Sequence, residues 1–133
     1  VHASTPEVYG NCSGNVKEHN HYQPSSPYAV SKAAADMSLM SFFSVYKFPV
    51  AFTRAANVYG PCQQLYRIIP RTIIYFLTGR TLELHGGGTA IRSFIHIHDV
   101  VNATLRIARN APAGECYHLS TKRSVSIRPM YVS

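Results

Sequence analysis

The chain has 133 residues, of which 46% are hydrophobic and 14% charged, and this composition excludes disordered and collagen-like chains. Lys and Arg exceed Asp and Glu by 13 to 6, a net charge of +7, but the basic residues are scattered singly. This pattern fits a phosphate-bearing ligand better than nucleic acid. No apolar run is long enough to cross a membrane. The three Cys lack CxxC spacing, which favours reduced thiols and a cytoplasmic location.

The first half of the chain is predicted to alternate between strands and helices. Residues 1–4 resemble the end of a buried strand, and the Gly-, Asn- and His-rich residues 10–24 predict a loop. A helix is expected over 28–46, opened by the run Ser25-Ser26-Pro27 with Ser as N-cap. Small and apolar residues at helical spacing predict its buried face: Val30, Ala33, Ala34, Met37 and Ser41.

The second half continues the alternation. Residues 50–54 predict a short strand, and a second helix is expected over 70–78 with Gly79 as its C-cap. Residues 82–84 predict a strand before the glycine turn at 86–88. Further strands are predicted at 93–97 and 115–119, on either side of a helix over 100–109 that Asp99 would cap. The alternation of strands and helices predicts an α/β domain.

The first candidate for chemistry is a Tyr and a Lys four residues apart. On a helix this spacing places the Tyr28 phenol and the Lys32 ammonium on one face, one turn apart. A nearby cation favours the phenolate, so such a Tyr can serve as a general acid or base. A solvated surface pair is the alternative, but the position in the first turns of a helix, directly after a polar loop, favours the chemical interpretation.

Two polar segments follow predicted strands, where open α/β sheets form their sites. In Ser4-Thr5-Pro6-Glu7-Val8-Tyr9-Gly10, a hydroxyl and a carboxylate come after the first strand. In Arg54-Ala55-Ala56-Asn57-Val58-Tyr59-Gly60-Pro61, an amide donor precedes a Gly-Pro turn. Taken alone, ordinary turn chemistry explains both segments, and for the first of them it is the better interpretation.

The segment Arg92-Ser93-Phe94-Ile95-His96-Ile97-His98-Asp99 allows two interpretations. His96 and His98 would share one face of a strand, as two metal ligands do. No third ligand is evident, however, and a strand leading into an Asp-capped helix explains the residues without a metal, so we predict no metal site. Arg92, just after the glycine turn, is a better candidate for a phosphate contact.

The order of these four motifs carries a resemblance to a known family. They follow one another with compatible spacing, up to about residue 126. The chain thereby resembles the extended short-chain dehydrogenase/reductases, and among them the NAD-dependent nucleotide-sugar epimerases and dehydratases. This implies an α/β fold: the C-terminal part of a Rossmann-like doubly wound parallel sheet plus part of a smaller substrate-binding lobe. Residues 1–62 would be the catalytic half of the NAD-binding domain, and residues 63–133 mostly the nucleotide-sugar lobe.

The resemblance also implies roles for the catalytic residues, with NAD as the cofactor. Thr5 would hydrogen-bond the sugar 4-hydroxyl, and Tyr28 would take the proton of that hydroxyl as hydride leaves C4 for NAD. Lys32 would hold the nicotinamide ribose and tune Tyr28.

On the substrate side, the resemblance implies a nucleotide-diphosphate sugar as the partner. Asn57 would contact it near the diphosphate, and Arg92 would bind a phosphate oxygen. The stretch from Leu82 to His85 would lie beside the nucleotide base. Family members commonly dimerise through the helix predicted over 28–46, so a homodimer is expected of the intact enzyme.

Glu7 and Pro6 bear on the reaction. Glu7 resembles the Glu with which sugar 4,6-dehydratases remove the C5 proton once C4 is a ketone. Pro6 stands where many dehydratases have an acidic Asp, although other members have Ser there, and UDP-glucuronate decarboxylases share a similar Ser-x-Glu pattern. The leading prediction is 4,6-dehydration of an NDP-hexose through a 4-keto intermediate, and the alternatives are an NDP-sugar 4-epimerase and a UDP-glucuronate decarboxylase.

The Gly-rich dinucleotide fingerprint that the family carries on its first strand-to-helix turn does not occur in this sequence. The run Gly86-Gly87-Gly88 cannot replace it, because it lies between predicted strands and opens no helix. We therefore expect a fragment of a longer NAD-dependent enzyme, inactive in isolation. The alternative is a non-catalytic remnant or an oligomerising module.

Overall fold

The first of two small sheets is parallel throughout. The computed structural model describes residues 1–12, 14–83 and 88–126. Strands β1 (His2–Ser4), β2 (Phe52–Ala55) and β5 (Cys116–Leu119) pair in the order β1-β2-β5. Residues 50–54 are buried throughout, because the middle strand of a parallel sheet is covered on both faces.

The second sheet continues from the carboxyl end of the first. Strand β3 (Asn57–Tyr59) follows β2 after one residue and pairs in parallel with β4 (Ile91–His96). Strand β6 (Ser124–Ser126) adds to β4 in the antiparallel direction. The short link between β2 and β3 places the opening of the second sheet beside the carboxyl ends of the first.

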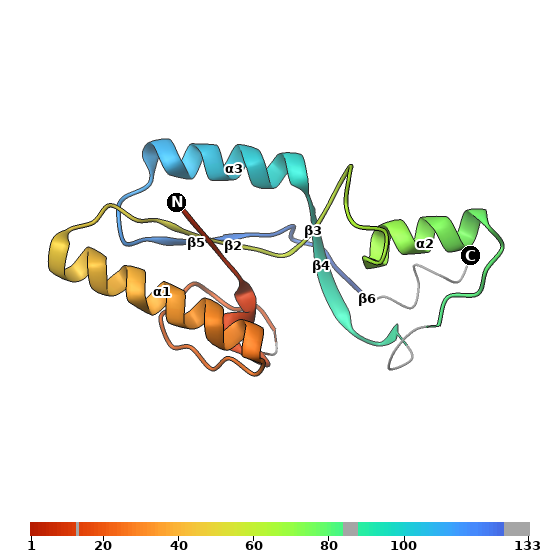
Figure 1. The fold of residues 1–133 in the computed structure, drawn as a ribbon, viewed down its shortest axis with the longest axis horizontal. Helices are drawn as coiled ribbons and strands as arrows, with labels where there is room; N and C mark the ends of the chain where they lie inside the picture. Colours follow the sequence, from red (N-terminus) through yellow and green to blue (C-terminus); the bar gives the residue numbers. More distant parts are fainter. Residues whose placement is uncertain (13, 84–87, 127–133) are drawn as a thin grey trace.

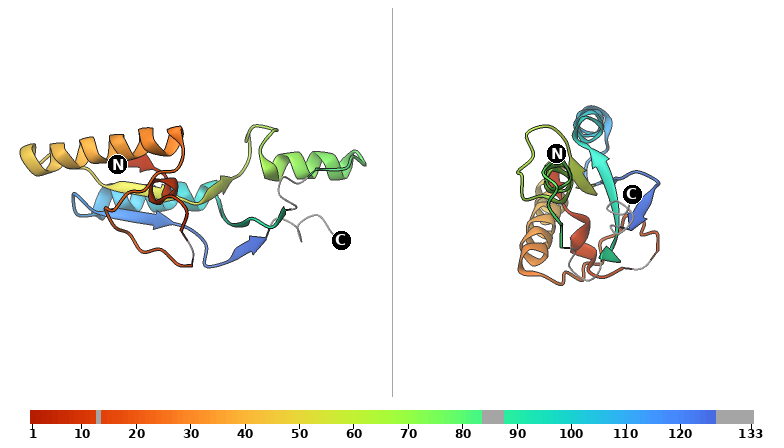
Figure 2. Two further views of the ribbon diagram at one scale, coloured as in Figure 1. Left: turned by 90° about the horizontal axis from the view of Figure 1, so that it is seen from below. Right: turned by 90° about the vertical axis from the view of Figure 1, so that its right-hand side faces the viewer.

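Helices cover both sides of the first sheet. Helix α1 (Pro27–Tyr46) and helix α3 (Ile97–Asn110) lie on opposite sides of β2 and β5 (Figure 1). Helix α2 (Ile68–Leu77) lies at the far end of the elongated molecule (Figure 2). A parallel sheet between helices is the doubly wound arrangement, so the predicted α/β fold class is confirmed. None of the described helices is both long and apolar enough to span a membrane.

The predicted buried face of α1 is wrong except for Ala33, because the helix is turned about its axis relative to the prediction. Val30 and Met37 were expected inside, yet 52% and 56% of their surfaces are exposed. The buried residues of the helix are Ala29, Ala33 and Asp36. Asp36 decides this orientation, because its carboxylate pairs with a buried arginine of β2 and must therefore face the sheet.

Other differences concern short elements and helix ends. Helix α3 begins at Ile97, and the His96 ring rather than Asp99 caps it, accepting a hydrogen bond from the backbone N–H of His98 at 3.3 Å. A strand was predicted over 82–84, but residues 82 and 83 pair with no strand among the described residues. Residue 84 lies outside the described residues. Helix α2 ends at Leu77, two residues before Gly79. Strands β3 and β6 and a 3-10 helix at Pro6–Tyr9 were not predicted.

Candidate active site

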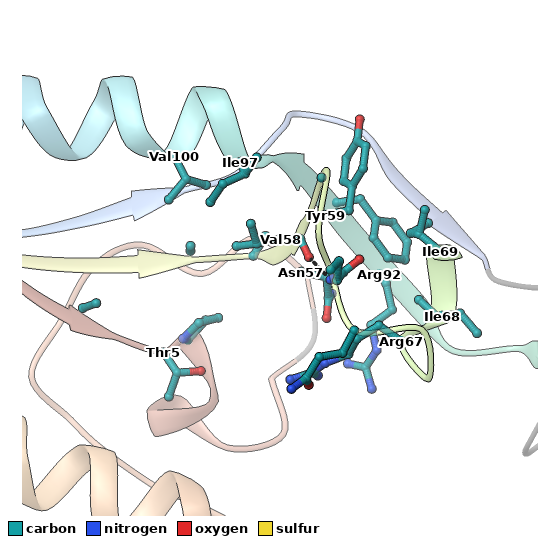
Figure 3. Close-up of a pocket in the computed structure, with 18 of the residues that line it drawn as sticks. Thr5, Asn57, Val58, Tyr59, Arg67, Ile68, Ile69, Arg92, Ile97 and Val100 are labelled. Atoms are coloured by element: carbon teal, nitrogen blue, oxygen red, sulfur yellow. Dashed lines mark hydrogen bonds between the residues drawn. The ribbon is translucent and has the colours of Figure 1, made fainter. Parts of the chain in front are cut away.

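A pocket of about 1070 Å³ opens at the carboxyl ends of β1 and β2, beside β3 and the first turns of α2 and α3. This is the edge at which open parallel sheets form their sites. The pocket is shown in Figure 3. It brings together most of the predicted site residues: Thr5, Glu7, Tyr28, Asn57 and Arg92.

A tight turn after β1 supplies the hydroxyl and the carboxylate. The chain leaves the strand at Ser4 and enters the 3-10 helix η1 (Pro6–Tyr9), for which Pro6 presets the backbone. Thr5 caps this helix, and its Oγ1 accepts a hydrogen bond from the backbone N–H of Glu7 at 3.3 Å. The Thr5 side chain is nearly buried whereas Glu7 is exposed, so one turn presents a fixed hydroxyl and a solvated carboxylate to the pocket.

The start of α1 supplies the phenol. Ser26 caps the helix as predicted, with its Oγ accepting from the backbone N–H of Ala29 at 3.2 Å, and Pro27 is the first helical residue. Tyr28 lines the pocket with 55% of its surface exposed. One turn on, Lys32 lies beside the pocket lining instead, and its Nζ donates to the backbone carbonyl of Ala3 at 2.6 Å.

Nitrogen donors gather on the other side of the pocket. The Nδ2 of Asn57 donates to the backbone carbonyl of Ser93 at 3.1 Å and so joins β3 to β4. Arg67 and Arg92 lie near Asn57, across the pocket from Thr5 (Figure 3). Arg67 was not predicted; the only signal was a lone basic residue just before the apolar start of α2. Two guanidinium groups in one pocket suit a diphosphate.

Leu82 and His85 were predicted to lie beside the nucleotide base. Leu82 follows α2 and is not part of the lining. His85 lies outside the described residues. Residues 82–85 beside the nucleotide base therefore stay a prediction.

A second polar cluster lies behind the pocket and was also missed. Arg54 of β2 and Asp36 of α1 are 1% and 0% exposed, and the arginine Nη2 donates to Asp36 Oδ2 at 2.9 Å. Nη2 also donates to the Tyr22 hydroxyl at 2.6 Å, and Nη1 donates to the Tyr9 hydroxyl. The guanidinium lies over both tyrosine rings, with centroid distances of 4.8 and 5.0 Å. The cation is stable in the core because nearly all its donors have partners.

Burial determines the protonation states around Arg54. Burial raises the pKa of the Tyr9 and Tyr22 phenols, so both stay protonated at neutral pH. Burial also lowers the pKa of His118, whose neutral Nε2 lies 3.0 Å from the Tyr9 hydroxyl. For Arg54, burial lowers the pKa, but the hydrogen bond with Asp36 and neighbouring groups outweigh this, so the net pKa is raised.

The two histidines weighed as metal ligands have another role. His96 caps α3 through its ring, which stands edge-on to the ring of His98 at a centroid distance of 4.9 Å. Within residues 1–12, 14–83 and 88–126, no three His, Cys, Asp or Glu side chains gather as a metal site would require.

Comparison with known proteins places the chain in a family. Residues 1–120 match the model of the NAD dependent epimerase/dehydratase family. The chain belongs to this family. The resemblance inferred from the four motifs is therefore confirmed. The chain is 39% identical over 128 residues to the human dTDP-D-glucose 4,6-dehydratase, an alignment that covers 96% of the chain and 37% of the human enzyme.

Solved structures of the family share the fold. The dTDP-glucose 4,6-dehydratase DesIV of Streptomyces venezuelae, solved with NAD bound, matches 98% of the chain and 41% of its own length, with a TM-score of 0.90 and 35% identity. A UDP-N-acetylglucosamine 4-epimerase of Methanobrevibacter ruminantium matches 98% of the chain and 43% of its own length, with the same TM-score and 28% identity. The chain thus spans less than half the length of these relatives.

Proposed function

We propose that this chain forms the catalytic part of an NAD-dependent nucleotide-sugar 4,6-dehydratase. The observation that carries the proposal is one pocket lined by the Thr5 hydroxyl, the Glu7 carboxylate and the Tyr28 phenol, with Arg67 and Arg92 in the same lining. Similarity to the human and Streptomyces 4,6-dehydratases supports it.

Two residues of the chain suit the nicotinamide end of NAD. Tyr28 is half exposed at the start of α1, and Lys32 reaches the carboxyl end of β1, where parallel sheets bind dinucleotides. When bound, NAD would accept a hydrogen with its electron pair from the sugar C4 and return them at C6, so no external oxidant is consumed. The sequence has no Gly-rich turn for the pyrophosphate, so these residues would hold part of the cofactor only.

Tyr28 and Thr5 would act first, on the sugar 4-hydroxyl. Tyr28 would take the proton of this hydroxyl while C4 is oxidised to a ketone. The Thr5 oxygen already accepts from the backbone N–H of Glu7, and its own hydrogen is left to point at the substrate oxygen. A hydroxyl held in this way positions the 4-oxygen for the transfer to Tyr28.

Glu7 would act second, at C5. The C4 ketone acidifies the adjacent C5–H bond, and the exposed carboxylate of Glu7 would remove that proton as the C6 hydroxyl leaves as water. When C6 is reduced, Glu7 would return a proton to C5. Pro6 has no acidic group, so the proton for the leaving hydroxyl comes from a group other than residue 6.

Charge complementarity supports a diphosphate-linked substrate. Among the described residues that line the pocket, the charged ones are Glu7, Arg67 and Arg92. The two guanidinium groups would bind the diphosphate, beside Asn57, and this would hold the sugar toward Thr5 and Glu7. The anion and the reacting carboxylate would then lie on different sides of the pocket.

The alternative with an observation in its favour is a 4-epimerase. The Methanobrevibacter epimerase has the same TM-score to the chain as the Streptomyces dehydratase, and Pro6 lacks the acid that many dehydratases use. An epimerase needs Thr5 and Tyr28 but no base at C5. Glu7 therefore separates the two reactions.

Replacing Glu7 tests the proposal in the whole protein. Glu7→Gln keeps the size of the side chain and removes its basicity, so the variant should still produce NADH absorbance from an NDP-hexose. Release of the 4-keto-6-deoxy sugar should fall by about 10²–10⁴-fold, the usual effect of losing a general base. Glu115→Gln is the matched control, because Glu115 is exposed and lies outside the pocket lining.

The wild-type protein decides between the reactions. If it makes no 4-keto-6-deoxy product from any NDP-hexose, the dehydratase proposal is wrong. Full epimerase activity in Glu7→Gln would support the 4-epimerase, and carbon dioxide release from a UDP-hexuronate would support a decarboxylase. The division at residue 62, a homodimer through α1 and a cytoplasmic location stay predictions.

A further inference from the structure

We propose that the buried Arg54–Asp36 pair is a positioning device that holds both ends of the segment 4–9. Within this segment, Tyr9 binds Arg54 and thereby anchors Glu7. The inference rests on the proposed function, because it assigns Thr5 and Glu7 to two successive chemical steps. Neither Arg54 nor Asp36 lines the pocket, so the pair would act through the segment and not on the substrate.

The first end of the segment is fixed through Asp36. The Ser4 hydroxyl donates to Asp36 Oδ2 at 2.7 Å, and Ser4 directly precedes Thr5. One turn earlier on α1, Lys32 donates to the carbonyl of Ala3. Two consecutive residues of β1 are thus bound by one face of α1, which fixes the position of the Thr5 backbone.

The second end is fixed through Arg54. The Tyr9 side chain is 5% exposed, and its hydroxyl accepts from Arg54 Nη1. The neutral His118 ring lies 3.0 Å away and can accept the hydrogen of the Tyr9 hydroxyl. Tyr9 is the last residue of η1, and Glu7 belongs to the same four-residue helix. A shift of the Tyr9 ring would therefore move Glu7.

Both ends meet at one ion pair. Oδ2 of Asp36 accepts from Ser4 and from Arg54, so Thr5 and Glu7 are held relative to a single buried group. The two steps need different atoms of the sugar, C4 and C5, at reacting distance from different residues. A displacement of about 1 Å can lower a rate about 10²-fold, so this geometry has to be kept.

Two single-atom deletions release the ends separately. Tyr9→Phe removes the hydroxyl that holds Glu7, while Ser4 remains bound to Asp36. Ser4→Ala removes the bond beside Thr5, while Tyr9 remains bound to Arg54. Both changes remove one oxygen and keep the backbone, and neither residue is assigned a chemical step.

The matched control is Tyr22→Phe. Tyr22 also accepts from Arg54 and also contributes an aromatic ring beside the guanidinium, but it belongs to the loop over 10–24. Its replacement removes one hydrogen bond to the same guanidinium and leaves the contacts of the Tyr9 hydroxyl with His118 and His19 in place, so Glu7 is not released. A general loss of stability would slow both chemical steps together, so the ratio of the two rates distinguishes it from the release of Glu7.

The kinetic readout is the ratio of two rates, the formation of product and the appearance of NADH absorbance, in single turnovers of the whole protein. Tyr9→Phe should lower the rate of product formation about tenfold or more relative to the appearance of NADH absorbance. Ser4→Ala should instead slow the appearance of NADH, and Tyr22→Phe should leave the ratio of the two rates unchanged. Equal slowing of both steps in Tyr9→Phe would overturn the proposal.

Hydrogen exchange decides the same question without activity. In the wild type, the backbone N–H of Gly10 donates to the Glu7 carbonyl at 3.0 Å, so exchange in a peptide covering residues 5–10 reports on η1. Tyr9→Phe should exchange faster there than Tyr22→Phe. If the two variants exchange equally, Tyr9 does not anchor Glu7, whether or not the protein proves to be a dehydratase. If Tyr9→Phe exchanges faster, the anchor is supported, again whatever reaction the protein catalyses.

Discussion

A side chain that acts on a substrate in this pocket has to be reachable by it and also held in place. Tyr28 meets both conditions, because its phenol is half exposed while the Ser26 cap and Pro27 fix the first turn of α1. Thr5 meets them differently, as a nearly buried residue whose oxygen also caps η1. Tyr28 and Thr5 are thus both held in position by the first turn of a helix.

The exposure of Tyr28 makes Tyr28→Phe a suitable test of its proposed role. The change removes the only ionisable oxygen of the side chain and leaves a ring that is already half in solvent, so the fold should be unaffected. Turnover of an NDP-hexose by the whole protein should fall about 10²–10⁴-fold. Tyr46→Phe, on an exposed tyrosine at the end of the same helix, is the control and should keep its turnover. Normal turnover in Tyr28→Phe would remove the catalytic assignment.

Among the structural elements, the 3-10 helix that presents Glu7 ends at a glycine with no room for a side chain. Gly10 has φ of 72° and ψ of −149°, a region that other residues rarely enter. A Cβ at Gly10 would also lie 2.1 Å from the backbone oxygen of Gln23. The loop over 10–24 therefore folds directly against the end of η1.

Gly10→Ala should destabilise the protein more than the same change at Gly14. Gly14 has a similar φ of 73°, but a Cβ added there would meet no atom of the described residues within 4 Å. Gly14→Ala is therefore expected to add backbone strain alone, about 1–2 kcal/mol. Gly10→Ala adds the contact with Gln23 to this strain. Urea unfolding of both variants measures the difference in the free energy of unfolding. Equal losses would show that the loop adjusts easily at Gly10.

The sequence allows some elements to be predicted and not others, for identifiable reasons. Helix α1 was predicted because Ser26, Pro27 and a long run of helix-forming residues are local signals. Its buried face was not, because it depends on the pairing of Asp36 with Arg54 across 18 residues of sequence. Short strands such as β3 and β6 depend on partners elsewhere in the chain, which no local pattern records.

The candidate site divides in the same way. Residues inside recognisable motifs, such as Thr5, Tyr28 and Arg92, were predicted and do line the pocket. Arg67 lies in no motif that marked it, and only the folded chain brings it near Arg92. Arg54 stood within a motif, yet its burial against Asp36 is visible only in three dimensions.

At the scale of the whole molecule, apolar side chains of the described residues remain exposed on the three α-helices α1, α2 and α3. On α1, 65% of Val45 is exposed, and on α2, 77% of Phe76 and 76% of Leu77 are exposed. Val101 and Leu105 of α3 are about half exposed as well. β1 and β5 are the edge strands of the described first sheet. Contiguous apolar surface and open strand edges are the usual sites of association between chains.

The 133 residues on their own should therefore self-associate and bind NAD weakly or not at all. Association follows from the exposed apolar side chains of α1 and α2, and weak binding follows because the sequence lacks a Gly-rich turn that would hold the pyrophosphate. Light scattering after gel filtration measures the first, and calorimetric titration with NAD measures the second. Changing Val45 and Phe76 to Lys should reduce the association without restoring NAD binding, because the two properties have separate causes. A monodisperse monomer that binds NAD at about micromolar concentration would contradict both arguments, since the residues at Tyr28 and Lys32 would then suffice to hold the cofactor.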